Sequence, residues 1–268
     1  MFFSIILPTF NSANFVNNAL DSLLKQKYKK FEIIASDDGS KDNTLQILKN
    51  YKKLFKKKKI NFLIIPNSHY GAGYARNKAI IKSQYDWLAF LDSDDTWHED
   101  KLLKVFIKIK KNNKINCIIH NEIHVTLANK KIYYEYTNMF NNKKKIFKQL
   151  FSRNFLSPTS TCIKKSIVEK HGMFDTNLQN AQDYDLWLKI GDELKIMKIK
   201  SYLGYYYERK ENISSKPYFL RIMNLLKIIN RYNKQVSTSA YYYKIIRLFI
   251  SKEWFKNLSD KIYFKKLH

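Results

Sequence analysis

The sequence predicts an α/β protein in which helices flank a mixed, mostly parallel sheet and an amphipathic helical tail follows. Strand-like and helix-like segments alternate through residues 1–100. The strand-like segments are continuously apolar, as expected of parallel strands buried on both faces. After Pro217 apolar residues recur at helical spacing among lysines and tyrosines, with almost no acidic residue.

Four continuous apolar runs predict the parallel strands, at residues 3–7, 31–35, 60–65 and 87–91. Helical patterns lie between them, at residues 15–24, 42–55 and 75–81. Asp42 or Asn43 fits the start of the second helix, because both residue types favour the N-cap position.

The second half of the chain is less regular. We predict a helix at 101–111, a strand at 117–125 that turns back at residues 128–130, and helices at 165–171 and 184–194. We therefore divide the chain into one domain at 1–215, with halves at 1–100 and 101–215, and a basic, aromatic-rich tail at 216–268.

The net charge of +26 on 268 residues is extreme. Such a field attracts anionic partners, namely nucleic acid, an acidic membrane surface or a phosphorylated substrate. A second explanation stays open. Only six of the 49 basic residues are arginines, and a lysine excess of this kind also arises from an AT-rich genome.

The two cysteines and the apolar runs bear on the compartment. Cys117 and Cys162 lie far apart in apolar stretches, which favours free buried thiols over a disulfide or a metal site. The apolar run at residues 2–7 is too short for a signal peptide, and no segment reaches the ~18 apolar residues of a membrane span. We expect a soluble or peripheral protein in the cytoplasm.

Small polar and acidic residues follow three predicted strands where each ends. Thr9 follows the first, Asp37 and Asp38 the second, and Asp92-Ser93-Asp94-Asp95 the fourth. In open parallel sheets ligands bind outside the carboxyl ends of the strands. Repulsion among these acids would destabilise the fold unless a cation or hydrogen-bonding group lies between them. The sequence therefore predicts a ligand site at this edge.

The cluster at residues 92–95 suits a hard divalent ion. Carboxylates without a thiolate or an organised histidine favour Mg²⁺ or Mn²⁺ over zinc. A solvated acidic turn is the alternative for this cluster. The stretch Asp37-Asp38-Gly39-Ser40 also allows two interpretations. It forms a turn, which the Asp-Gly pair favours, or one of its aspartates accepts hydrogen bonds from a nucleotide base or ribose.

Gly71-Ala72-Gly73 is half of a dinucleotide-binding fingerprint. Arg76 occupies the third glycine position and the motif does not directly follow a strand, so we reject a Rossmann cofactor site. Arg76, near a predicted helix start, could pair with a diphosphate, or lie on the surface.

Five stretches together resemble the family 2 glycosyltransferases in order and approximate spacing, over residues 1 to roughly 210. They are Ile6-Leu7-Pro8-Thr9-Phe10-Asn11, Ser36-Asp37-Asp38-Gly39-Ser40-Lys41-Asp42, Ala75-Arg76-Asn77, Phe90-Leu91-Asp92-Ser93-Asp94-Asp95-Thr96-Trp97 and Ala181-Gln182-Asp183-Tyr184-Asp185-Leu186-Trp187-Leu188. The resemblance implies a GT-A fold, a nucleotide-sugar donor that is most often UDP-linked, a divalent metal and inversion at the anomeric carbon.

The resemblance also implies roles for residues of the first half. Thr9 and Asp38 would contact the uridine, with Asp37 nearby. Arg76 would lie near the base or the diphosphate.

The acidic cluster would bind the other end of the donor. Asp92, with Ser93, would meet the ribose or the sugar. Asp94 would bind Mn²⁺ or Mg²⁺, together with Asp95.

Asp183 would be the catalytic base. Where the commoner pattern has Glu-Asp, this chain has Gln182-Asp183, which removes a negative charge that would raise the pKa of the base. The alternative for Asp183 is an N-cap of the following helix. Tyr184 and Trp187 either form an apolar wall for the acceptor or, for Trp187, pack in the core.

The resemblance implies sugar transfer from a UDP-sugar to a hydroxyl of a glycan or lipid-linked glycan, in bacterial surface polysaccharide, lipooligosaccharide or glycoprotein glycan assembly. The alternatives are an inactive nucleotide-sugar binder and a basic nucleic-acid-binding protein. The acid-lined edge argues against nucleic acid, so we expect no such partner. A glycoside hydrolase would use paired carboxylates but not Asp37, Asp38 and Arg76.

The tail combines basic residues with aromatic ones, among them Tyr218, Phe219, Tyr241, Tyr242, Tyr243, Phe249, Trp254 and Phe255. A basic amphipathic segment of this kind, at 217–268, suits the anionic inner leaflet, beside a lipid-linked acceptor. In the other interpretation these aromatics pack on the catalytic domain or on a second subunit of a homo-oligomer.

Overall fold

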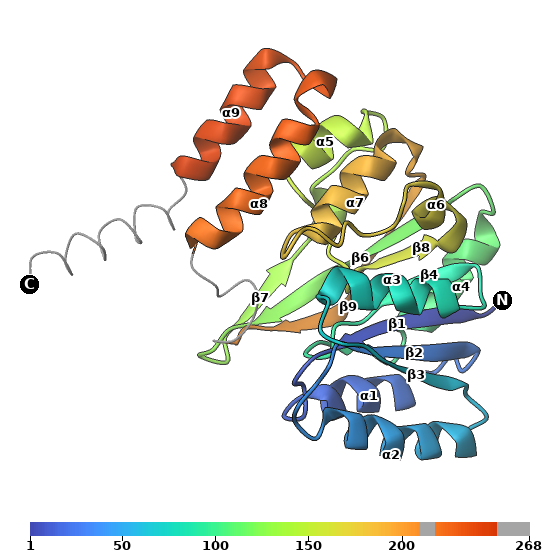
Figure 1. The fold of residues 1–268 in the computed structure, drawn as a ribbon. Helices are drawn as coiled ribbons and strands as arrows, with labels where there is room; N and C mark the ends of the chain where they lie inside the picture. Colours follow the sequence, from blue (N-terminus) through green and yellow to red (C-terminus); the bar gives the residue numbers. More distant parts are fainter. Residues whose placement is uncertain (210–217, 251–268) are drawn as a thin grey trace, which may run out of the picture.

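The computed structural model describes residues 1–209 and 218–250 (Figure 1). Its strands are β1 Phe3–Thr9, β2 Phe31–Asp37, β3 Phe62–Pro66, β4 Trp87–Phe90, β5 Thr96–Trp97, β6 Cys117–Val125, β7 Lys131–Tyr134, β8 Thr161–Lys164 and β9 Ile196–Tyr207. Its α-helices are α1 Val16–Leu24, α2 Thr44–Lys57, α3 Ala72–Lys82, α4 Lys101–Lys111, α5 Ile146–Ser152, α6 Lys165–Lys170, α7 Gln182–Ile190, α8 Tyr218–Arg231 and α9 Thr238–Phe249. Short 3₁₀ turns are η1 Tyr136–Asn138, η2 Gly191–Glu193 and η4 Asn233–Gln235.

The strands of the described residues form one sheet in the order β3-β2-β1-β4-β8-β6-β9-β5, with β7 paired to β6. The four strands at the β3 end run parallel, and β6 and β9 are also parallel to each other. β8 runs antiparallel to both β4 and β6 and joins the two halves. The mixed, mostly parallel sheet predicted from the sequence is confirmed.

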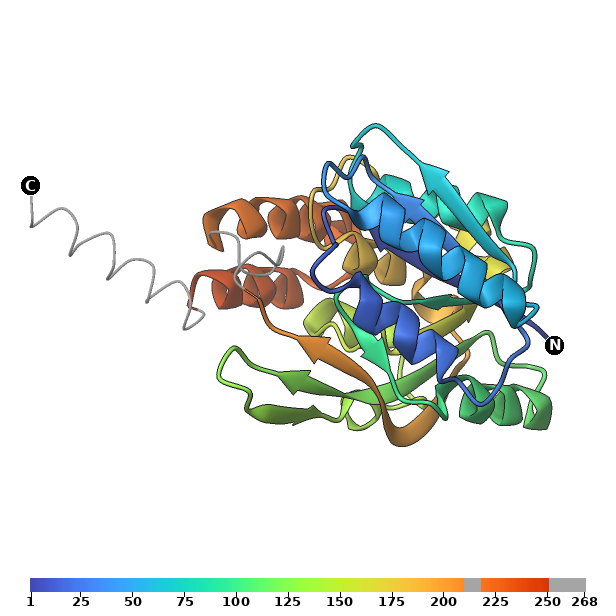
Figure 2. The same cartoon turned by 90° about the horizontal axis from the view of Figure 1, so that it is seen from below.

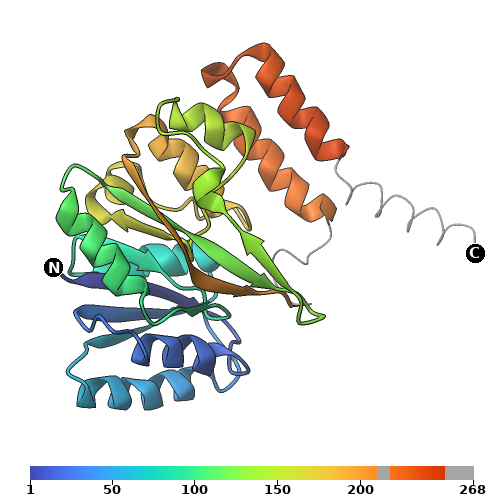
Figure 3. The same cartoon turned by 180° about the vertical axis from the view of Figure 1, so that it is seen from behind.

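The strands are buried on both faces because each face carries its own core. In β1, Ile5 and Leu7 belong to the core that packs against α1, α2 and α4, whereas Ile6 belongs to the core on the opposite face. Figure 2 shows α1 and α2 side by side on the first of these faces. Figure 3 shows α4 and the long strands β6 and β9 from behind. This arrangement explains the continuous apolar runs of the first half.

Several local predictions hold at the level of single residues. The helix at 101–111 and the strand at 117–125 coincide with α4 and β6, and Asn129 turns the β6–β7 hairpin with a φ of 58°. Cys117 and Cys162 are buried and free, as predicted. In the two ranges that the structure describes, no helix combines the length and the apolar character needed to cross a bilayer.

The chain after residue 217 forms a helical hairpin as far as it is described. α8 lies beside α7, and α9 lies on the outer side of α8 (Figure 1). Ile228, Ile229 and Tyr232 are buried in the same core as α7. α8 is therefore packed on the main body. Of the tail aromatics, Trp254 and Phe255 lie outside the described residues.

Candidate functional site

The carboxyl ends of β1, β2 and β4 bring the predicted site residues to one edge of the sheet. Thr9 and Asp37 are paired neighbours at the ends of β1 and β2. Residues 92–95 follow β4, and the Ser93 hydroxyl lies 2.8 Å from that of Ser12, which follows β1. The polar strand ends thus meet, as the parallel-sheet argument requires.

Asp37 organises the turn that follows β2. Its Oδ1 accepts hydrogen bonds from the hydroxyls of Thr9 at 2.8 Å and Ser40 at 2.6 Å, and its Oδ2 accepts from the Ser40 backbone N–H at 2.9 Å. Gly39 has a φ of 80°, and a Cβ there would lie 3.1 Å from the backbone nitrogen of His69. The Asp-Asp-Gly-Ser stretch is therefore a tight turn that needs its glycine.

Asp38 fastens the loop that leads into α3. Its two carboxylate oxygens accept from the backbone N–H groups of Tyr70 and Gly71, each at 2.8 Å. Beside it, the exposed ring of Phe10 stacks on His69 with ring centroids 4.2 Å apart. No sequence motif identifies this ring pair, which offers a flat aromatic surface next to Asp38.

Arg76 links Asp92, which follows β4, to the start of α7. Its Nη2 donates to Asp92 Oδ1 at 2.6 Å and its Nη1 to Gln182 Oε1 at 3.5 Å. Burial alone would lower the pKa of Arg76. The negative charges of Asp92, Asp183 and Asp94 outweigh this effect and raise its pKa above the usual value. Three carboxylates therefore act on one buried guanidinium, whose Nε has no hydrogen-bond partner.

Asp94 and Asp95 have different surroundings. Burial, followed by the charge of Asp92, raises the pKa of Asp94 to about 6. Asp95 is 3% exposed, and burial together with the charge of Asp94 raises its pKa well above the usual value. The Thr159 hydroxyl donates to Asp95 Oδ2. Asp94 thus lies nearer the solvent, and Asp95 is turned into the protein.

This donor set fits a divalent cation that is shared with a substrate. Among residues 1–209 and 218–250, no three His, Cys, Asp or Glu side chains are gathered in a way that could hold a metal. Mg²⁺, however, is usually bound by one or two carboxylates plus substrate phosphates. Asp92 and Asp94 meet that description, since their mutual repulsion raises the pKa of Asp94 and a cation would relieve it.

Arg209 is a second arginine at this edge, and no motif pointed to it. Its Nη2 donates to the backbone carbonyl of Asp94 at 3.0 Å, and its guanidinium lies 3.9 Å from the centroid of the Phe15 ring. Its charge also works to lower the pKa of Asp94. Arg76 and Arg209 thus contribute two positive charges beside the acidic cluster.

Asp183 lies in the first turn of α7 and is half-buried. Burial raises its pKa, and the charge of Arg76 partly opposes this rise. The N-cap alternative is wrong, because Ala181 occupies that position with a φ of 55°. Asp183 is therefore not the N-cap, but its carboxylate lies in the first helical turn and accepts a hydrogen bond from the Tyr184 backbone N–H.

Tyr184 and Trp187 do not form a wall for an acceptor. Trp187 is fully buried and its Nε1 donates to the Leu156 carbonyl at 2.9 Å. Tyr184 is 4% exposed and its hydroxyl donates to the Phe151 carbonyl at 3.0 Å. Both side chains are core, which confirms the second interpretation for Trp187 and excludes the first for both residues.

The family follows from comparison with known proteins. The model of glycosyl transferase family 2 matches residues 4–172. The chain belongs to this family. An uncharacterized glycosyltransferase of Rickettsia typhi is 31% identical over 69% of this chain. The matched part covers 57% of that relative's length. The amylovoran biosynthesis glycosyltransferase AmsB of Erwinia amylovora is 29% identical over 70% of this chain and 63% of its own.

Solved structures share the fold. TarS 1–349 of S. aureus, solved in complex with UDP-GlcNAc, matches with a TM-score of 0.69 and 21% identity over 97% of this chain and 80% of its own. The mannosyltransferase PcManGT of Pyrobaculum calidifontis, solved with GDP-Man and Mn²⁺, matches with a TM-score of 0.67 and 15% identity over 93% of this chain and 70% of its own. The expected GT-A type of fold is confirmed.

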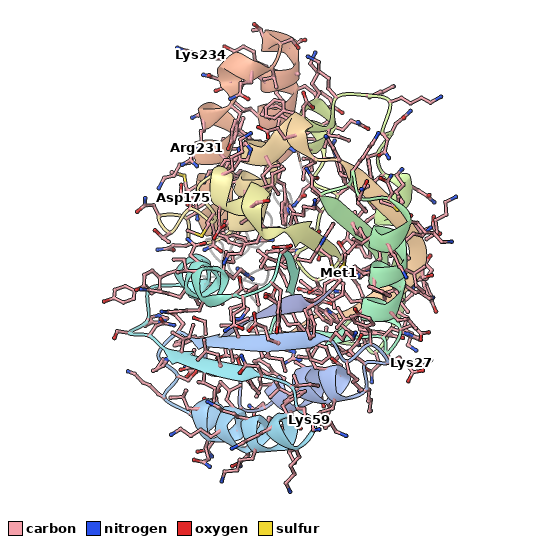
Figure 4. All side chains as sticks on the ribbon, turned by 90° about the vertical axis from the view of Figure 1, so that its right-hand side faces the viewer. Met1, Lys27, Lys59, Asp175, Arg231 and Lys234 are labelled. Atoms are coloured by element: carbon pink, nitrogen blue, oxygen red, sulfur yellow. The ribbon has the colours of Figure 1, made fainter. Side chains whose placement is uncertain are left out.

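In this family member, α8 holds the helix that carries Asp183. Asp185, two residues further along α7, is fully buried. It pairs with Arg231 Nη1 at 2.7 Å and Lys189 Nζ at 3.0 Å, and it accepts from the Tyr232 hydroxyl at 3.1 Å. The Nη2 of Arg231 also lies 2.7 Å from Oδ2 of Asp175, a residue of the loop before α7 (Figure 4). One arginine of α8 therefore ties down both α7 and the preceding loop.

Replacing Arg231 with methionine should lower the free energy of unfolding by about 2 kcal/mol, because hydrogen bonds to charged groups contribute about 1.5–3 kcal/mol. Urea unfolding measures the change. Lys234→Met, an exposed site on the same hairpin, is the control and should stay within about 0.5 kcal/mol of the parent. Equal effects of the two substitutions would show that Arg231 does not anchor α7.

Proposed function

We propose that this chain is an inverting glycosyltransferase that moves a sugar from a UDP-sugar to a hydroxyl of a glycan or lipid-linked glycan. One observation carries the proposal. Arg76 bridges Asp92, at the end of β4, and Gln182, at the start of α7. The carboxylates of Asp92 and Asp94 and that of the candidate base, Asp183, thereby act on the same Arg76 guanidinium.

The donor nucleotide would lie across the ends of β1 and β2. The stacked pair of Phe10 and His69 gives a nucleobase a flat partner, beside Asp38. Asp38 Oδ1 accepts one backbone hydrogen bond and can accept a second from a base or ribose, whereas Oδ2 accepts from Gly71 and also lies 3.2 Å from His69 Nδ1. Thr9 and Asp37 would support this pocket. The UDP-GlcNAc in the TarS structure favours UDP as the nucleotide.

The diphosphate and sugar would lie beside the acidic cluster. Arg76 and Arg209 would hydrogen-bond the phosphate oxygens, as arginines do with planar geometry and full charge. Asp92, with Ser93, would contact the ribose or sugar. Asp94 with Asp92, and Asp95 behind them, would hold Mn²⁺ or Mg²⁺, which when bound would supply Lewis-acid stabilisation of the leaving diphosphate.

Asp183 would act on the acceptor. As the acceptor oxygen attacks the anomeric carbon and the bond to the diphosphate oxygen breaks, the Asp183 carboxylate takes the hydroxyl proton. A base in this role lies about 2.6–3.2 Å from the oxygen that it deprotonates. Arg76 and Arg209 stabilise the negative charge that develops on the departing diphosphate.

The acceptor class is inferred from the relatives. AmsB is named for amylovoran biosynthesis, which favours a glycan acceptor in bacterial surface polysaccharide, lipooligosaccharide or glycoprotein glycan assembly. A lipid-linked acceptor would place the enzyme in the cytoplasm at the inner face of the membrane.

A thermal-shift panel of nucleotide sugars with Mn²⁺ tests the donor. At a ligand concentration about 100-fold above Kd, a UDP-sugar should raise Tm by about 5–10 °C. Metal-dependent release of UDP from that donor would then exclude an inactive nucleotide-sugar binder. No shift with any nucleotide sugar, together with steeply salt-dependent binding to DNA or RNA, would favour the nucleic-acid alternative instead.

A further inference from the structure

The inner face of α9 packs on the protein. Tyr241, Ile245 and Leu248 contact the core that also contains α7. On the same side, Lys244 Nζ donates to the Ser152 carbonyl of α5 at 3.0 Å. The helix is therefore held in a defined orientation, with its other face turned away from the body of the molecule (Figures 1 and 3).

The outer face of α9 is exposed and apolar. Its large side chains and their exposed fractions are Tyr242 57%, Tyr243 58%, Ile246 51%, Phe249 40% and Ile250 61%. The spacing of residues 242, 246, 249 and 250 forms one continuous stripe along a helix. Contiguous exposed apolar side chains of this kind mark a surface that contacts a partner.

The charge of the hairpin selects the kind of partner. Residues 218–250 contain six Lys and Arg residues and no Asp or Glu. Arg247 is exposed on the outer face, with its guanidinium 5.8 Å from the centroid of the Tyr243 ring. A second copy of the chain would bring the same basic surface into a two-fold contact, where the like charges repel. A partner that is both negatively charged and apolar fits this face.

We propose that the outer face of α9 docks on an anionic lipid bilayer. Ile246, Phe249 and Ile250 enter the boundary between headgroups and acyl chains, while the amphipathic rings of Tyr242 and Tyr243 lie at the headgroup level. Arg247, which is exposed on this face, meets the negative lipid headgroups. Because α8 packs between α7 and α9, docking of α9 also orients the sugar site relative to the membrane. Only the link to a lipid-linked acceptor rests on the proposed function.

Co-sedimentation of the full-length chain with vesicles tests the proposal. Vesicles of phosphatidylglycerol and phosphatidylcholine should bind the protein, and vesicles of phosphatidylcholine alone should bind it weakly. Combining Ile246→Ser, Phe249→Ser and Ile250→Ser should lower the partition coefficient at least about tenfold, through lost apolar burial. The matched control combines Leu54→Ser, Ile107→Ser and Leu127→Ser, which are similarly exposed elsewhere, and should bind like the parent.

Three results would overturn the proposal. The parent could fail to bind the anionic vesicles. The α9 triple variant could bind as tightly as the parent, which would leave the overall charge as the only cause. Sedimentation velocity could instead show a dimer that the triple variant loses, without vesicle binding, which would assign the face to a second copy. UDP release, measured on the same variants, tests the proposed function separately from the docking face.

Discussion

Replacing Asp183 with asparagine should lower the rate of sugar transfer by roughly 10²–10⁴-fold, the usual contribution of a general base. Asparagine has nearly the same shape but cannot take a proton. Asp183 lies in the first turn of α7 and is not among the residues proposed to hold the nucleotide, so UDP-sugar binding should stay nearly intact. UDP release measures the rate, and thermal shift measures donor binding.

The pH dependence sharpens this expectation. Burial raises the pKa of Asp183, and a base is active only when deprotonated. The rate of the parent enzyme should therefore fall as the pH decreases through that raised pKa, at a higher pH than for an exposed aspartate with a pKa near 3.9. The residual rate of Asp183→Asn should lack this acid limb.

The control is Asp86→Asn, an exposed aspartate before β4 at the opposite end of the sheet, which should leave the rate unchanged. An Asp183→Asn enzyme with full activity would show that the base assignment is wrong.

The first half of the fold was predictable because its strands carry strong local signals. β1, β2 and β4 are continuous apolar runs that end in polar residues, and parallel packing alone puts those ends at one edge. The alignment of Thr9 with Asp37 follows from the β1–β2 register. Family membership and the GT-A fold are likewise confirmed. The roles of the individual site residues remain predictions.

The second half has weaker local signals. β9 was missed because lysines and a serine interrupt its apolar residues, leaving several positions only half-buried. β5 and β8 contain two and four residues, too few for a periodicity to emerge. Their strand character comes from pairing with β9, β4 and β6. Tertiary contacts, rather than propensity, decide these elements.

Site residues that act through long-range contacts had no signal in the sequence. Arg209 reaches Asp94 from a position 115 residues further along the chain, and no motif surrounds it. Arg231 contacts Asp185 from a segment that composition alone marks as a tail. The N-cap alternative for Asp183 failed for a related reason: Ala181 adopts a left-handed backbone conformation, which its residue type disfavours.

Replacing Asp94 with asparagine should abolish the dependence on Mn²⁺ and remove most turnover, roughly 10²–10³-fold, since a Lewis-acid metal supplies several kcal/mol of stabilisation. Asp95→Asn is the informative comparison. Asp95 accepts from the Thr159 hydroxyl, and the carbonyl of Thr159 accepts from buried Lys101 at 2.6 Å. Its substitution should therefore change the free energy of unfolding more than the Mn²⁺ requirement.

Titration of UDP release with Mn²⁺, together with Mn²⁺ binding in the presence of UDP by electron paramagnetic resonance, separates the two residues. Loss of Mn²⁺ binding in Asp95→Asn but not in Asp94→Asn would reverse their assignments. Unchanged binding in both variants would mean that the acidic cluster is only a turn. Burial and the charge of Asp92 raise the pKa of Asp94, and a cation beside the two carboxylates would offset their repulsion.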